Sequence, residues 1–118
     1  MELSLDIKSL DRNISSEILG SDSISTDTEV RIAEGVSIRF DGEGFTKVVG
    51  APIDASFIIS CAPGIAAGIA SGVISNWLYD KLKGKRIQKV TIESTEVNFN
   101  DQGQIEKIVK EKIRGENY

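Results

Sequence analysis

Residues 55–84 read ASFIISCAPGIAAGIASGVISNWLYDKLKG and predict a strand that leads directly into a long helix. The first part, Ala55–Cys61, is uncharged and partly β-branched, which favours a buried strand. Pro63 suits the first turn of a helix, because a proline there gives up no helical hydrogen bond. We expect the helix to run from Pro63 to about Lys83 and to end at Gly84.

The two faces of this predicted helix differ in the size of their side chains. On a helical wheel, one arc carries the bulky and apolar residues Ala66, Ala67, Ile69, Ala70, Val73, Ile74, Trp77 and Leu78. We expect this arc to pack on a sheet. The opposite arc is nearly bare backbone and carries Gly64, Gly68, Ser71, Gly72, Ser75 and Asn76.

The glycine-bearing arc calls for a covering surface. Each glycine costs roughly 1 kcal/mol of helix propensity relative to alanine, and a solvent-facing helix would recover none of this cost. Close approach of another backbone would recover it through packing contacts. Three surfaces could approach in this way: another part of the chain such as the C-terminal helix, a second protein molecule, or a lipid bilayer.

The bilayer alternative rests on the absence of charge from Ala55 to Tyr79. Trp77 and Tyr79 lie at the end of this run, where interfacial anchors are found, and lysines follow at once. However, a Pro-Gly pair divides the run and leaves a piece at the short limit for a spanning helix. Membrane insertion of residues 56–79 is therefore an alternative to a protein contact.

Beyond the helix lies one basic cluster. In the simplest interpretation its lysines offset the negative end of the helix dipole and are solvated. An acidic protein partner and nucleic acid are the alternatives, but no aromatic residues for base stacking are interleaved with the bases. A net charge of −4 also argues against nucleic acid. The cluster consists of Lys81, Lys83, Lys85, Arg86 and Lys89.

The segments before and after this central region predict the rest of a sheet. Residues 2–7 alternate between apolar and polar side chains, which predicts a half-buried strand. Asp11 could cap a short helix that Gly20 ends, and residues 21–28 have the composition of a loop. Further strands are expected at residues 29–33, 35–40, 45–49 and 86–100, with a hairpin turn at 41–44 and a break near Ser94–Thr95.

Residues 104–114 predict a C-terminal amphipathic helix with Gly115 as its stop. Together the elements predict an α+β fold. In this fold a small, mainly antiparallel sheet packs on the glycine-rich central helix and on the C-terminal helix. A length of 118 residues suits a single domain, 1–118. The apolar face of the last helix consists of Ile105, Ile108, Val109 and Ile113.

The composition excludes several chemistries. The chain has no histidine, which removes Ser-His-Asp and Cys-His nucleophile activation and nearly all zinc sites. The acids show no calcium-loop spacing and the glycines no phosphate-loop spacing. Cys61 has no cysteine to pair with, and the acidic first residues do not resemble a signal peptide, so we expect a cytoplasmic protein. We expect no metal, no cofactor and no enzymatic activity.

The sequence favours a protein-interaction or assembly module, which would bind another protein or a second copy of the chain. Its contact surface would combine the glycine-spaced helix with the adjacent basic cluster. Membrane insertion and a carboxylate-based enzyme are the alternatives. The predicted contact residues are Gly64, Gly68, Ser71, Gly72, Ser75, Trp77, Tyr79, Lys81, Lys83, Lys85, Arg86 and Lys89.

Overall fold

The computed structural model describes residues 1–45 and 48–115 of the chain. Strands and helices alternate irregularly along this part of the sequence, as an α+β fold requires. In chain order the elements are β1 (Glu2–Ser9), α1 (Ile14–Leu19), β2 (Glu29–Ala33), β3 (Val36–Phe45), β4 (Ile53–Cys61), α2 (Ala67–Leu82), β5 (Ile87–Ile92), β6 (Thr95–Val97) and α3 (Gln102–Gly115).

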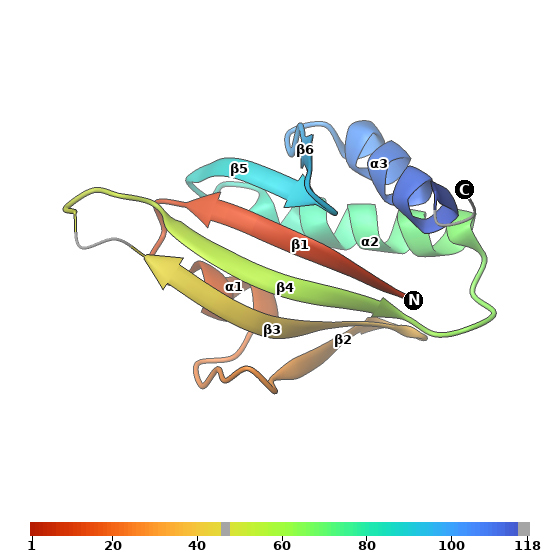
Figure 1. The fold of residues 1–118 in the computed structure, drawn as a ribbon, viewed down its shortest axis with the longest axis horizontal. Coiled ribbons are helices and arrows are strands. Elements are labelled where there is room, and N and C mark those ends of the chain that lie inside the picture. Colours follow the sequence, from red (N-terminus) through yellow and green to blue (C-terminus); the bar gives the residue numbers. More distant parts are fainter. Residues whose placement is uncertain (46–47, 116–118) are drawn as a thin grey trace.

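The strands form one six-stranded sheet in the order β2-β3-β4-β1-β5-β6, and every neighbouring pair is antiparallel (Figure 1). β1 lies inside the sheet, with β4 on one side and β5 on the other. Because both neighbours are antiparallel to β1, they run parallel to each other. Parallel strands need a long crossover connection, and α2 supplies it.

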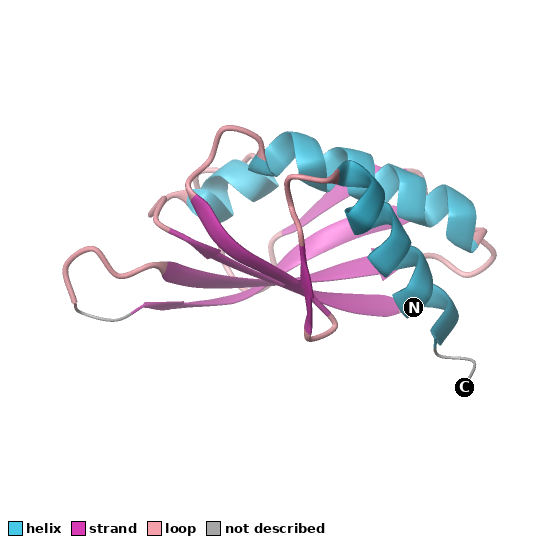
Figure 2. Ribbon diagram, turned by 90° about the horizontal axis from the view of Figure 1, so that it is seen from above, coloured by secondary structure: helices cyan, strands magenta, loops and turns pink. Residues whose placement is uncertain are grey.

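The helices cover one face of the sheet, and α3 packs beside α2 near β5 and β6 (Figure 2). The strands alternate accordingly. In β1, Leu3, Leu5 and Ile7 have no exposed surface, whereas Glu2 and Asp6 lie on the other face and are exposed. The core therefore lies between one face of the sheet and the helices, which confirms the predicted α+β arrangement.

The glycine-rich stretch at residues 41–44 is part of a strand and not the expected hairpin turn. β3 continues through it to Phe45 and stays paired with β4, with a register shift between Phe40 and Gly42. Gly42 has a φ of 139°, a conformation that side-chain-bearing residues rarely adopt. This glycine therefore serves an irregularity within the strand rather than a reversal of the chain.

The strand expected at residues 45–49 is accordingly wrong. Phe45 ends β3, residues 46–47 lie outside the described residues, and Val48 and Val49 belong to the connection that leads to β4. The local composition favours a turn. Pairing with β4 along the whole of β3 outweighs that preference, because strand propensity depends strongly on tertiary context.

The short helix α1 ends at Gly20 as expected, with a φ of 67°. Asp11, however, does not cap it. Its carboxylate accepts hydrogen bonds from the backbone N–H and the Nε of Arg86, at 2.8 and 2.9 Å. These bonds, the backbone one above all, lower the pKa of Asp11. These bonds link the β1–α1 turn to the start of β5. The link is fully formed at pH values above the ordinary carboxyl pKa, and it weakens as the pH falls through the lowered pKa of Asp11.

The break expected near Ser94–Thr95 is a complete chain reversal. Ile92 pairs with Thr95, so Glu93 and Ser94 form the whole turn, with φ of 48° and 67°. Such angles match the twist of a two-residue hairpin but strain residues other than glycine. The Glu93 carboxylate accepts hydrogen bonds from the N–H and the Oγ of Ser4, at 3.3 and 2.6 Å. These bonds fasten the turn to β1 and offset its strain.

Replacing Glu93 with alanine should lower the free energy of unfolding by about 1–3 kcal/mol, because the Ser4 donors lose their acceptor while the strained turn remains. Glu96→Ala, at an exposed position of β6, is the matched control and should change it by less than about 0.5 kcal/mol. Urea titration of both variants measures the difference. Equal effects at the two positions would show that the Ser4 contact does not support the turn.

α3 buries the face that the sequence predicts, but unevenly. Ile105 and Val109 have no exposed surface, whereas Ile108 and Ile113 are only partly buried against the core.

Ile105→Ala should therefore cost about 2–5 kcal/mol of stability in a urea titration, and Ile108→Ala clearly less. If Ile108→Ala proved the costlier change, the observed rotation of α3 would be incorrect.

Candidate functional site

α2 begins at Ala67, later than the predicted Pro63, and is turned about its axis relative to the expected orientation. Ile69, which was expected to pack on the sheet, is 66% exposed. The expectation that the bulky arc as a whole faces the sheet is therefore wrong. The interior face combines Ala70, Ile74 and Leu78 of the bulky arc with Ser71 and Ser75 of the glycine-bearing arc, and it extends to Leu82.

Two serines allow this orientation. Ser71 and Ser75 are 0% and 1% exposed, and their hydroxyls donate to the carbonyls of Gly68 and Gly72, each at 3.1 Å. A buried hydroxyl that has an acceptor costs little, so both serines act as small interior side chains. Their hydroxyls are used inside the helix, which removes them from the accessible contact surface that the sequence predicted.

The three glycines of the predicted contact face have different surroundings. Gly64 precedes the helix with a φ of 92°, so backbone conformation explains it. A Cβ added at Gly72 would lie 3.5 Å from Oε2 of Glu106 in α3, which is an ordinary contact. A Cβ added at Gly68 would meet nothing within 4 Å. Thus α3 lies beside the glycine row, but no described residue approaches closely enough to require glycine at position 68 or 72.

Gly35, in the turn between β2 and β3, is the glycine whose missing side chain matters most for packing. It has a φ of 77°, and a Cβ there would collide with Cδ1 of Ile65, just ahead of α2. The Ile65 side chain therefore occupies the space that a side chain at position 35 would need. Gly35 was missed by the sequence reasoning, since nothing in the local pattern links it to Ile65.

The two aromatic residues of the predicted contact set do not stand free at the helix end. Trp77 and Tyr79 are both partly buried and pack against the core. No helix in the described part of the chain is long and apolar enough to cross a membrane.

The basic cluster is dispersed over several surfaces. Lys85 lies 3.5 Å from Glu17 of α1, and Arg86 is bound to Asp11, so both bases hold the start of β5 to the α1 region. Lys89 lies on β5 opposite Lys8, on the sheet face away from the helices. The remaining members, Lys81 and Lys83, lie at the end of α2. The structure therefore does not combine the five bases with the glycine row.

The first half of α2 and the loop before it remain accessible. Ile69 is one of three exposed large hydrophobic residues among those described, and the other two, Val48 and Val49, lie in the β3–β4 connection. The exposed residues next to it along the chain carry no charge. We call this region the α2 entry surface; it consists of Ala62, Pro63, Gly64, Ala66, Gly68 and Ile69.

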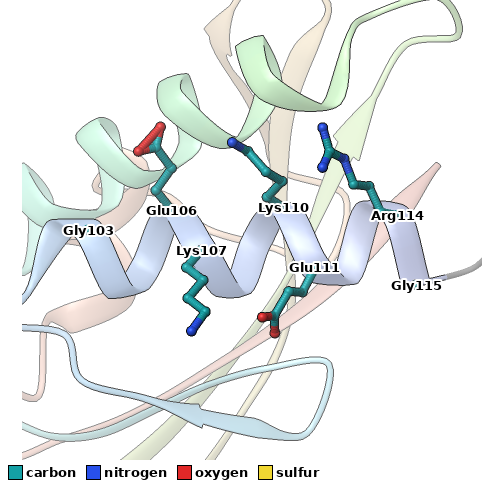
Figure 3. A pocket seen from close by; sticks show the side chains of 7 residues that line it. All are labelled: Gly103, Glu106, Lys107, Lys110, Glu111, Arg114 and Gly115. Carbon is teal, nitrogen blue, oxygen red and sulfur yellow. The ribbon is translucent and has the colours of Figure 1, made fainter.

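A hollow of about 780 Å³ along α3 offers no alternative site. As far as the described residues show, α3 alone lines it. Glu106, Lys110 and Arg114 point toward α2, whereas Lys107 and Glu111 point away on the other side (Figure 3). Charges spread along one solvent-facing helix do not converge on a common point, as groups in a binding or catalytic site do.

The potential for metal or thiol chemistry is limited in the part of the chain that the structure describes. No three His, Cys, Asp or Glu side chains gather there as metal ligands would. Cys61 is 8% exposed, and burial raises the pKa of its thiol, so the nucleophilic thiolate is disfavoured at neutral pH.

Comparisons with protein-family models, with curated protein sequences and with solved structures gave no significant match.

The surroundings of two glycines predict opposite effects of alanine. Gly68→Ala should raise the free energy of unfolding of the monomer by up to about 1 kcal/mol, because the position is open and lies in the first turn of α2. Gly35→Ala should lower it by about 1–3 kcal/mol, because a positive φ and the Ile65 contact both oppose a Cβ. Urea titrations at low protein concentration measure both changes. A loss of stability for Gly68→Ala would mean that the space beside Gly68 is filled.

Proposed function

We propose that the protein is a non-enzymatic assembly module in which two copies of the chain pack through the α2 entry surface. The observation that carries this proposal is Gly68 beside Ile69. A single exposed isoleucine is unremarkable. Next to it, however, lies a glycine in the first turn of α2, and no described residue fills the space that its side chain would occupy.

A second copy suits this surface electrostatically. The chain has a net charge of −4, so most contacts between two copies bring like charges together. The α2 entry surface lies within the uncharged run Ala55–Tyr79 and avoids this repulsion. Association there would depend on apolar burial and would be insensitive to salt.

The small residues suit a close helix crossing. Glycine and alanine let two helix backbones approach, which increases the van der Waals contact between them. In a two-fold pair the same patch lies on both sides of the contact. Ile69 of one copy would then cover the open space over Gly68 of the other. Such a contact would account both for the exposed isoleucine and for the glycine beside it.

The basic cluster is not part of this proposal. Lys85 and Arg86 already bind acids of the same chain, and Lys89 lies across the sheet from α2. The proposed contact is therefore narrower than the one that the sequence predicts.

Wild-type protein should show a mass of twice 12.8 kDa in light scattering at high concentration and should dissociate on dilution. Ile69→Asp should stay at 12.8 kDa, because a carboxylate would be buried in the contact. Val49→Asp introduces the same charge at a more exposed valine outside the contact and is the matched control; it should associate like wild type.

Gly68→Leu separates folding from assembly. Its side chain enters open space in the monomer, so the unfolding midpoint of the dilute variant should stay near that of wild type, while the dimer is lost through a clash. A wild-type mass of 12.8 kDa up to millimolar concentration would contradict self-assembly.

A further inference from the structure

β3 is longer than β2, the strand at the edge of the sheet beside it. It pairs with β4 along its whole length, from Val36↔Cys61 to Phe45↔Ile53. Its pairing with β2 stops at Arg39, and the bond from the Phe40 N–H to the Thr28 carbonyl is the last link. On the side away from β4, the far half of β3 therefore has no strand beside it within the described chain (Figure 1). We call residues 41–44 the open β3 edge.

The open β3 edge offers backbone hydrogen-bonding groups. In an antiparallel pair, alternate residues direct their N–H and C=O toward the partner strand and the others direct them away. Within the described chain, no backbone group of residues 41–44 bonds to any segment except β4. Gly42 and Gly44 carry no side chain, and no described atom lies within 4 Å of the position that a Cβ would take on either residue. An incoming strand could pair with this edge of β3 beyond the start of β2.

A hollow of about 260 Å³ lies beside the open β3 edge, between α1, the following loop and β3. Phe40 and Ile24 contribute partly buried apolar surface to it, and its charged lining consists of two acids, Asp22 and Glu43, and one base, Arg12. Side chains of a strand point alternately to its two faces. One row of side chains of an added strand would therefore enter this hollow. The hollow could take the aliphatic part of a lysine or arginine side chain together with its charged group.

Acids flank the open β3 edge on both faces of the sheet. Glu43 reaches toward the helices, where the buried Ser15 hydroxyl donates to its carboxylate at 2.7 Å. Arg39 lies on the other face of the sheet. Its pKa is raised mainly by Glu2, and the nearby carboxylate of Asp41 adds to this effect. A second copy paired across this edge would bring the acids of both copies close together, which weakens strand pairing.

We propose that the open β3 edge docks an extended, basic segment of another protein as an added strand. Backbone bonds along Asp41–Gly44 would hold the segment, and its Lys or Arg side chains would meet acids on either face. The charge at the edge selects such a partner and opposes pairing between copies, so this contact is separate from the α2 entry surface.

The probe is a short synthetic peptide of alternating lysine and valine, titrated into the isotope-labelled full chain. Amide shifts should concentrate at residues 41–44 and 22–24, and binding should weaken as salt is added. Asp41→Lys should weaken it by about fivefold, the scale of one cross-strand charge pair. Glu96→Lys makes the same charge change on β6 at the opposite edge and should bind like wild type.

Three results would overturn the proposal. One is equal binding of a glutamate–valine peptide, which would show that charge does not select the partner. Another is a set of shifts centred on the outer edge of β2 or on the open sheet face instead of β3. The third is concentration-dependent protection of the residue 41–44 amides without peptide, which would make a second copy the occupant.

Discussion

The pairing of β1 with both β4 and β5 is the constraint on which the rest of the structure depends. Leu3, Leu5 and Ile7 have no exposed surface, and the Met1 carbonyl accepts a hydrogen bond from the Cys61 N–H at 2.9 Å. Because β4 and β5 flank the same strand, the chain between them must cross one face of the sheet. α2 is that crossover, and its buried side covers the apolar face of the strands. The side turned away from the core includes Ile69.

Much of the fold could be predicted from local patterns. The alternation of apolar and polar residues predicted β1, and the apolar spacing at Ile105 and Val109 predicted the inward face of α3. Both signals depend only on which side of an element is apolar. Residues 41–44 were mispredicted because their glycines and acids favour a turn locally, whereas pairing with β4 along the full length of β3 decides the outcome. That pairing is a long-range property, which local composition does not encode.

The contact residues were harder to predict, for two physical reasons. Ser71 and Ser75 count as polar on a wheel, but their bonds to helix carbonyls let them be buried, which rotates α2 and exposes Ile69. The basic cluster is contiguous in sequence, but Arg86 pairs with Asp11, far away along the chain, and only the folded structure brings these residues together. The sequence drew attention to the glycines of α2 but could not show that the space beside Gly68 is open.

Cysteine crosslinking gives the most direct measurement of the proposed pairing of α2 with α2. In a Cys61→Ala background, Ile69→Cys places a single thiol at the centre of the α2 entry surface, and Val49→Cys places one at a site that is 95% exposed. We expect Ile69→Cys to form an interchain disulfide faster under mild oxidation, although position 69 is less exposed, because the dimer holds its two copies together. Equal rates, or faster crosslinking at position 49, would contradict assembly through α2.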